Sequence, residues 1–141
     1  MANTRIPEDS LKIELNRADS PVLQQLNGIG PVFAARIIEY RKLLGGYVWK
    51  EQLLEVYGMD SVRFAGIAGH IAVDSTLVRK ININKSSIRE LTAHPYIEFF
   101  LAKSIVRYRE EKGKIGSLTD FAKQSGIPEE IGKKIGPYLD L

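Results

Sequence analysis

The chain contains no cysteine, only two methionines and one tryptophan, and no long apolar run. Without cysteine it can form neither a disulfide framework nor a cysteine-ligated zinc or iron-sulfur site. No stretch reaches the roughly 18 apolar residues of a membrane span, and the first residues lack the pattern of a signal peptide. The sequence therefore predicts a soluble chain. It leaves the compartment open between the bacterial cytoplasm and, for a piece of a longer anchored protein, the outer face of the membrane.

A strong charge excess is also missing, because 20 lysines and arginines face 17 aspartates and glutamates. The net charge of +3 and the pI near 9.1 suit a polyanionic partner only if the basic residues gather on one face. The length of 141 residues suffices for one ordinary domain or two very small ones. It argues against a large enzyme with a deep cleft.

What the chain does have is an internal repeat of about half its length. A shift of 68 residues aligns the segments 13–73 and 81–141 without a gap. Eleven aligned pairs are identical, and they fall mainly on apolar and turn positions, which a shared fold constrains most. They include Asn16/Asn84, Leu23/Leu91, Ile29/Ile97, Ala34/Ala102, Ile37/Ile105, Tyr40/Tyr108, Arg41/Arg109, Gly45/Gly113, Gly58/Gly126 and Ile67/Ile135. We therefore predict a leader at 1–12, repeats at 13–73 and 81–141, and a connector at 74–80.

Within each repeat the apolar residues recur at helical spacing, and no sustained period-two run competes with them. Asp19 or Ser20 can cap the first helix, Ser87 can cap its counterpart, and Pro31 suits a first helical turn. Gly45 can end the long helix of the first repeat. The sequence predicts an all-α protein of about four short helices per repeat. The expected ranges are 20–26, 31–44, 50–57, 60–68, 87–94, 98–112, 117–125 and 128–135.

The segment 27–32, Asn-Gly-Ile-Gly-Pro-Val, carries the strongest functional signal. Two glycines around one aliphatic residue allow a tight turn with positive φ and the close approach of another backbone. Ile29 is expected to anchor the turn in the core. Pro31 then begins a helix whose unpaired N–H groups and positive dipole end favour a phosphate.

This segment resembles the helix-hairpin-helix family, in particular the ComEA type of bacterial competence protein, the DNA receptor of natural transformation. The resemblance covers all of the first repeat and the framework of the second. It rests on Asn16, Arg17, Ala18, Asp19, Leu23, Leu26, Gly28, Ile29, Gly30, Ala34, Ile37, Tyr40, Arg41, Gly45, Leu53, Leu54 and Gly58. The resemblance implies two hairpins per unit in a small SAM-domain-like helical bundle. It also implies binding of duplex DNA through backbone phosphates across the minor groove.

The second repeat departs from this pattern. Its first hairpin reads Pro-Tyr-Ile-Glu at 95–98, so both glycines are missing, and Glu98 is expected to repel a phosphate and to cap its own helix. The second hairpin of each repeat keeps one glycine. Asp60 again suggests a cap, whereas Gly126 remains open to an anion. One of four hairpins is therefore intact.

The predicted DNA-binding residues combine hairpin positions with supporting cations from both repeats. They are Asn27, Gly28, Ile29, Gly30, Val32, Arg36, Arg41, Lys103, Arg107 and Gly126. The cations would add salt-dependent phosphate contacts. A solvated helix face accounts for any one of them equally well, and a structural ion pair is the alternative for Arg41. Because no metal-ligand cluster, nucleophile–base pair or Walker sequence is visible, we expect no enzyme activity, no cofactor and no small-molecule substrate.

The predicted function is sequence-independent binding of double-stranded DNA, in DNA uptake or in repair. Non-specific contacts of this kind have dissociation constants of about 10⁻⁴–10⁻⁶ M at physiological salt. The competing hypothesis is a protein-interaction scaffold, because three degenerate hairpins indicate that at least one repeat has lost backbone recognition. That hypothesis places a protein partner on the second repeat.

Overall fold

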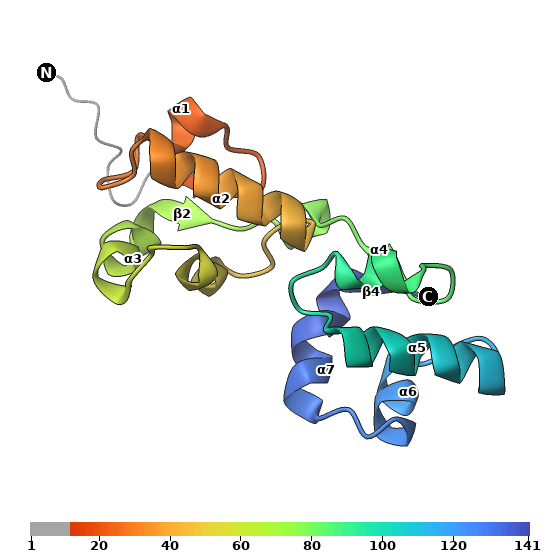
Figure 1. The fold of residues 1–141 in the computed structure, drawn as a ribbon. Coiled ribbons are helices and arrows are strands. Elements are labelled where there is room, and N and C mark those ends of the chain that lie inside the picture. The colour runs from red at the N-terminus through yellow and green to blue at the C-terminus, as the bar shows by residue number, and fades with distance from the viewer. Residues whose placement is uncertain (1–11) are drawn as a thin grey trace, which may run out of the picture. The chain divides into compact units, whose positions relative to one another are not determined.

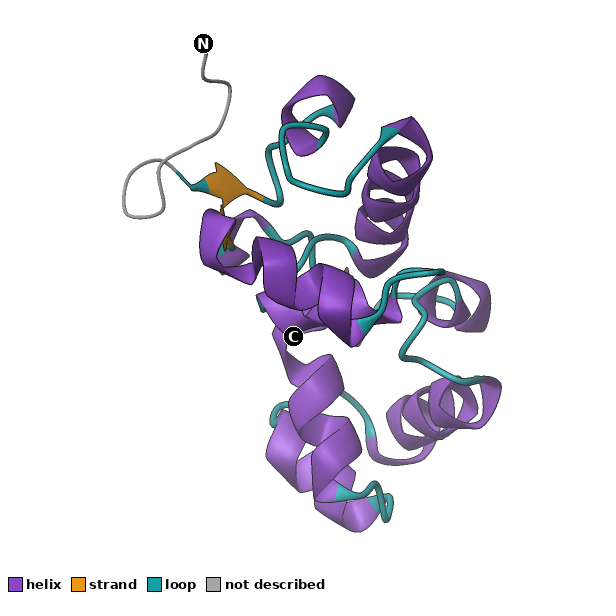
Figure 2. Cartoon of the chain, turned by 90° about the vertical axis from the view of Figure 1, so that its left-hand side faces the viewer, coloured by secondary structure: helices purple, strands orange, loops and turns teal. Residues whose placement is uncertain are grey.

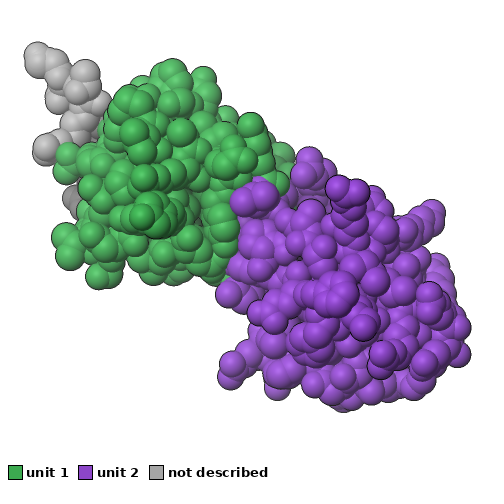
Figure 3. All heavy atoms as spheres, viewed as in Figure 1, with its two compact units in different colours: residues 1–42, 46–78 green, residues 43–45, 79–141 purple. Residues whose placement is uncertain are grey.

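The computed structural model describes residues 12–141, so the predicted leader at 1–12 lies almost wholly outside the described residues. The described chain is mainly helical, as predicted, and divides into two compact units (Figures 1 and 3). Unit 1 comprises the residues up to 42 and 46–78, and unit 2 comprises 43–45 and 79–141. None of the described helices is long and apolar enough to cross a lipid bilayer.

Unit 1 alternates short helices with tight loops. Its elements are β1 (Ile13–Glu14), α1 (Ser20–Leu23), α2 (Pro31–Leu44), the 3-10 helix η1 (Lys50–Glu55), α3 (Ser61–Ile67), η2 (Ala68–His70), β2 (Ile71–Ala72) and η3 (Ser75–Leu77). The helix predicted at 31–44 is confirmed at both ends. The helix predicted at 50–57 is a shorter 3-10 helix, and the predicted connector contains η3.

Unit 2 repeats this order with regular α-helices in most places. Its elements are β3 (Ile81–Asn82), α4 (Ile88–Thr92), α5 (Phe99–Lys112), α6 (Leu118–Gln124), α7 (Glu129–Ile135), η4 (Gly136–Tyr138) and β4 (Leu139–Asp140). Each predicted helix of the second repeat is present, with ends that differ from the prediction by at most two residues. The third helix is α-helical here, whereas its counterpart η1 in unit 1 is not.

Each unit also contains a short parallel strand pair that the sequence did not predict, drawn in orange in Figure 2. β1 pairs with β2, with Ile13 opposite Ile71, and β3 pairs with β4, with Ile81 opposite Leu139. Strands of two residues are too short for alternation to reveal them. The pairing joins the first and last segments of each repeat, so the two ends of each unit lie side by side.

The predicted helix ends depend on local hydrogen bonds. The Asp19 carboxylate accepts a hydrogen bond from the Val22 N–H at 3.1 Å, which caps α1. Ser87 and Glu90 form a reciprocal capping box at the start of α4. α2 ends before Gly45, whose φ of +89° lies in the left-handed region that favours glycine. These caps confirm the predicted start of α1, the predicted capping of α4 by Ser87 and the predicted end of α2, whereas α1 ends at Leu23, three residues before its predicted end.

Two identical asparagines hold the same contacts in both units. The Asn16 side chain donates to the Tyr47 carbonyl at 2.9 Å and accepts from the Tyr47 N–H at 2.7 Å. Asn84 makes the same pair of bonds with Ile115, at 3.0 and 2.7 Å. Each asparagine therefore ties the loop after the first strand to the loop after the long helix.

Arg41, which the sequence placed at the phosphate site, contacts the backbone of its own unit. Its Nη1 donates to the carbonyl oxygens of Leu15 and Ala18 at 2.8 and 2.7 Å. Arg109 donates in the same way to two carbonyls of unit 2, at 3.0 and 2.7 Å. These charge-assisted bonds hold the loop after the first strand. The structure therefore gives Arg41 a structural role, and its phosphate contact stays a prediction.

The predicted connector begins with a residue that is tied into unit 1. The Asp74 carboxylate accepts hydrogen bonds from the hydroxyl and the N–H of Thr76, at 2.5 and 3.1 Å. Its other oxygen lies 3.5 Å from the Arg17 guanidinium. The Thr76 hydroxyl and then the Thr76 N–H hold the pKa of Asp74 below its ordinary value of 3.8.

This lowered pKa predicts a specific acid sensitivity. Because the folded-state pKa lies below the unfolded value, Asp74 stabilises the fold above the unfolded pKa, and this contribution is lost as the pH falls through the folded-state pKa. We expect a carboxyl-carbon NMR titration of Asp74 to have its midpoint below 3.8. Thr76→Val removes the hydroxyl donor and should move that midpoint upward. An ordinary midpoint in the unmodified chain would refute the hydrogen bonding described for Asp74.

Candidate nucleic-acid interface

The loop between α1 and α2 forms the first hairpin of unit 1. Gly28 has a φ of +82°, so the turn requires the conformational freedom of glycine. Ile29 is 4% exposed, and its N–H donates to the Leu26 carbonyl at 3.1 Å. The prediction that Ile29 anchors the turn in the core is confirmed. Its side chain shapes the loop and is too buried to contact a ligand.

Gly30 and Pro31 form the beginning of α2. A Cβ atom added to Gly30 would meet no atom within 4 Å, so packing does not require this glycine. With no side chain at Gly30, nothing from this residue can cap or cover the first helical turn. The N–H groups of that turn and the positive end of a 14-residue helix therefore favour an anion here. Val32, in the same turn, is 62% exposed.

A second hairpin of unit 1 joins η1 to α3. A shift of 30 residues aligns it with the first hairpin, placing Gly58 on Gly28 and Met59 on Ile29. Gly58 has a φ of +83°, and Met59 is buried. The two hairpins therefore share one local structure, in which a positive-φ glycine is followed by a buried apolar residue.

The two hairpins differ at the start of their second helix. The Asp60 carboxylate accepts a hydrogen bond from the Arg63 N–H at 2.7 Å and caps α3, as the sequence predicted. This carboxylate already satisfies one free N–H of the first turn and opposes an anion there. Of the two helix starts, only that of α2 stays open.

Two arginines connect the elements around these hairpins. The Arg36 Nη1 donates to the Tyr57 carbonyl at 3.2 Å, and the Arg63 Nη1 lies 3.5 Å from the Gly58 carbonyl. Their guanidinium carbons lie 5.3 and 4.2 Å from the centroid of the Phe33 ring. The Arg36 guanidinium also lies 4.8 Å from the centroid of the Tyr57 ring, so both cations are held in place by carbonyl oxygens and aromatic rings.

Close contacts at the two glycines show that the hairpins are neighbours. A Cβ atom added to Gly28 would lie 3.8 Å from the Arg63 Nε. A Cβ atom added to Gly58 would lie 2.9 Å from the Arg36 Nη1 and would displace this guanidinium, while the φ of +83° favours glycine here. Both loops and both guanidinium groups belong to one surface. We call residues 27–32, residues 57–63 and Arg36 the cationic hairpin face.

This face gathers most of the predicted residues of the first repeat and adds one that the sequence analysis missed. Asn27, Gly28, Ile29, Gly30, Val32 and Arg36 lie at or beside the first hairpin. Arg63 was missed because its contact with the first hairpin depends on how the two hairpins pack. The 30-residue alignment between the hairpins was the signal that could have found it, because it marks 57–63 as a second functional loop.

The predicted cations of unit 2 do not form a comparable face. Lys103 and Arg107 are exposed and lie one turn apart on α5. Gly126 has a φ of +69°, but Glu129 and Glu130 occupy the first turn of the helix that follows it. Carboxylates at this end of a helix neutralise its dipole and oppose an anion. DNA contacts of these positions stay a prediction.

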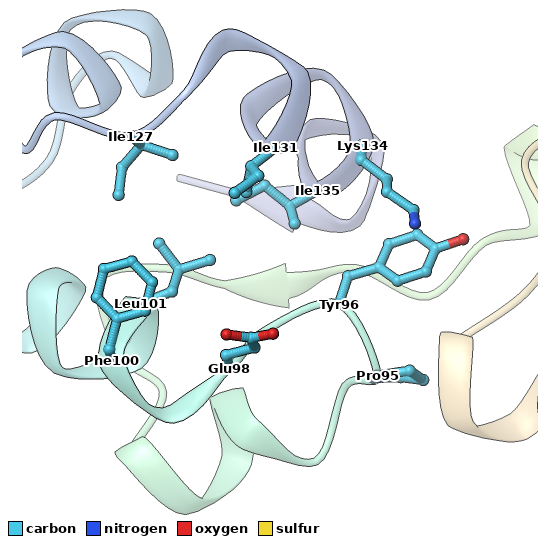
Figure 4. A pocket seen from close by; sticks show the side chains of 9 residues that line it. All are labelled: Pro95, Tyr96, Glu98, Phe100, Leu101, Ile127, Ile131, Lys134 and Ile135. Atoms are coloured by element: carbon cyan, nitrogen blue, oxygen red, sulfur yellow. The ribbon is translucent and has the colours of Figure 1, made fainter.

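Glu98 also differs from expectation. It precedes α5 in the N-cap position, yet its side chain makes no capping hydrogen bond. The carboxylate instead lines a cavity between the hairpins of unit 2 (Figure 4). Among the described residues there is no cluster of three side chains that could hold a metal ion.

Comparison with known proteins agrees with the repeat and with the hairpins. The endonuclease/exonuclease/phosphatase family domain-containing protein 1 of Mus musculus is 25% identical over 145 residues, which cover 82% of this chain and 26% of that protein. The protein of the same name from Danio rerio is 27% identical over 142 residues, covering 88% and 26%. ComE operon protein 1 of Bacillus subtilis (strain 168) is 31% identical over 78 residues, covering 55% and 38%. The chain thus spans well under half of each relative's length.

No solved structure matches the chain. The family profile described as the helix-hairpin-helix motif matches twice, over residues 8–72 and 78–140. These two segments correspond to the two units and together take up nearly the whole sequence. The chain therefore belongs to the helix-hairpin-helix family.

Proposed function

We propose that unit 1 binds the sugar-phosphate backbone of double-stranded DNA without reading its sequence, and that the chain has no catalytic role. One observation carries the proposal: the open first turn of α2 lies on the same surface as the guanidinium groups of Arg36 and Arg63. Membership of the helix-hairpin-helix family and the likeness to ComE operon protein 1 support DNA binding.

The groups on this face suit phosphate oxygens. The N–H groups at the start of α2 would donate to one phosphate, and Arg36 and Arg63 would pair with others. Both guanidinium groups are already positioned by the Phe33 ring, which reduces the side-chain entropy lost on binding. Contacts of this kind fix the protein on the duplex and carry no direct information about base identity.

The two exposed valines of the hairpins complete the face. Val32 and Val62 follow the two hairpin turns at positions related by the 30-residue shift, and they are 62% and 81% exposed. We infer that they contact sugar groups of the minor groove, where small apolar side chains fit between the phosphate rows. Either DNA uptake or DNA repair can use such a module. The likeness to the competence family favours uptake.

Removing either arginine charge should weaken duplex binding. We expect Arg36→Gln and Arg63→Gln each to raise the Kd by about three- to tenfold and to reduce the slope of log K against log salt concentration by about 0.9. Fluorescence anisotropy of a labelled duplex across a salt series measures both quantities. Arg89→Gln, an equal charge change on an exposed residue of unit 2, is the matched control. An equal loss of duplex affinity in all three variants would show that the net charge of the chain, and not the position of the arginine, determines the effect.

The protein-interaction hypothesis is favoured for unit 2 by one specific observation. The face that corresponds to the cationic hairpin face has lost both arginines and gained a carboxylate and exposed aromatic rings. Scaffolding by unit 2 and DNA binding by unit 1 are compatible functions of one chain.

A further inference from the structure

A cavity of about 240 Å³ lies between the two hairpins of unit 2, in the position that corresponds to the cationic hairpin face (Figure 4). Its walls are mainly apolar and come from the loop before α5, from α5 itself and from the segment 127–135. Tyr96 and Phe100 contribute aromatic rings, and Glu98 contributes a carboxylate that Figure 4 shows between them. The cavity therefore combines mainly apolar walls with one acidic group, Glu98, and one basic group, Lys134.

The internal repeat shows which side chains unit 2 has lost at this place. The 68-residue shift aligns Arg63 with Ile131 and Arg36 with Ser104. Neither guanidinium of unit 1 has a counterpart in unit 2. Ile131 lines the cavity and is 37% exposed. Where unit 1 supplies two guanidinium groups between the hairpins, unit 2 has mainly apolar walls and the single ammonium group of Lys134.

The carboxylate in this space has no cation of its own within the described chain. The Glu98 side chain makes no hydrogen bond or ion pair with another residue of 12–141, although its backbone carbonyl accepts from the Ala102 N–H. The other charged group in the cavity wall is Lys134, whose Nζ lies 4.3 Å from the centroid of the Tyr96 ring. The Lys134 ammonium thus already makes a cation–π contact. Glu98 can accept a further cation from outside the chain.

Unit 1 shows which cation fits between two such hairpins. The Arg63 guanidinium lies over the Phe33 ring at 4.2 Å, and its Nε is within 3.8 Å of a Cβ added to Gly28. Gly28 aligns with Tyr96. A guanidinium entering the unit 2 cavity would therefore lie near Tyr96, whose ring already contacts the Lys134 ammonium. There it would be near the Glu98 carboxylate, which has no counterpart in unit 1.

We propose that this cavity binds an arginine side chain of a partner protein. The planar guanidinium pairs with Glu98 and stacks on an aromatic ring of the wall, as guanidinium groups do in protein interfaces. Apolar residues next to that arginine contact the exposed rings of Phe99 and Phe100, which are 61% and 57% exposed. Duplex DNA is a poor occupant, because Glu98 would face its phosphates.

A labelled peptide tests this directly on the full chain. The probe is a short peptide with one arginine between leucine and phenylalanine, and its matched controls replace the arginine by lysine or by the neutral isostere citrulline. We expect the arginine peptide to bind most tightly in fluorescence anisotropy and the citrulline peptide least. Glu98→Gln should weaken the arginine peptide about fivefold and remove its advantage over citrulline.

A second variant places an arginine of the chain itself in the cavity. Ile131→Arg copies Arg63 of unit 1 and supplies a resident guanidinium, so it should abolish peptide binding. Gly30→Glu in unit 1 should leave peptide binding unchanged. Amide NMR spectra of each variant report whether the fold is kept, and the peptide should shift signals at 95–101 and 127–135.

Three results would each overturn the proposal. The first is equal affinity of the arginine and citrulline peptides for the unmodified chain. The second is unchanged binding in both Glu98→Gln and Ile131→Arg. The third is displacement of the peptide from unit 2 by duplex DNA, which would make this face a nucleic-acid surface. None of these outcomes depends on whether unit 1 binds DNA.

Discussion

Gly30→Glu is expected to abolish most duplex binding, with a rise in Kd on the order of tenfold or more. The substitution copies into unit 1 the residue that unit 2 carries at the aligned position, Glu98. The carboxylate would neutralise the positive end of α2 and repel the phosphate. The fold should tolerate it, because a Cβ on Gly30 meets no atom within 4 Å and this glycine has no positive φ. Duplex anisotropy over a salt series measures the loss.

Two variants separate the charge from the size of the new side chain. Gly30→Gln has nearly the same volume without the charge and should keep most of the affinity. Glu98→Gln changes a charge on unit 2 and should leave duplex binding unchanged. If Gly30→Glu binds duplex as tightly as the unmodified chain at every salt concentration, the start of α2 has no part in binding. Absence of any salt-sensitive binding would favour the scaffold function for both units.

Arg41→Met is expected to destabilise unit 1 by about 3 kcal/mol, because it leaves two carbonyl oxygens without their charged donor. Methionine keeps an unbranched apolar stem and removes the guanidinium. The acceptors are the carbonyls of Leu15 and Ala18, in the loop that β1 and the Asn16 side chain also hold. Trp49 is the single tryptophan of the chain and lies in unit 1, so its fluorescence in a urea titration reports the unfolding of this unit.

The matched variant is Arg109→Met, which removes the same two bonds from unit 2. It should leave the Trp49 transition of unit 1 in place, while amide exchange in unit 2 accelerates. Under native conditions Arg41→Met should bind duplex with unchanged affinity. If Arg41→Met has normal stability but binds duplex DNA tenfold more weakly, Arg41 contacts a phosphate, as the sequence predicted.

Local features of the fold could be predicted because their causes are local. The cap of Asp19 on α1, the box formed by Ser87 and Glu90, and the end of α2 before Gly45 each depend on residues within one helical turn. The 68-residue repeat gave the organisation into two units for a similar reason. Identical apolar and turn positions require the same packing in both copies.

The features of the candidate site that the sequence did not predict come mainly from contacts between distant segments. The carbonyl contacts of Arg41 could not be predicted because its acceptors lie 23 and 26 residues earlier in the chain. Arg63 was overlooked because it reaches the first hairpin only when the two hairpins pack together. Glu98 was expected to cap α5 from its position alone, but its side chain lines the cavity of unit 2. In each case the backbone position was predicted correctly and the direction of the side chain was not.

The most direct test of DNA binding by unit 1 is an amide NMR titration of the full chain with a short duplex of arbitrary sequence. If unit 1 binds the DNA backbone, the signals of residues 27–32 and 57–63 should shift together, by the same pattern for unrelated sequences, and return as salt is added. Signals of the unit 2 hairpins, at 95–101 and 126–132, should stay in place. Shifts confined to those unit 2 hairpins, or a pattern that changes with the base sequence, would contradict this backbone binding.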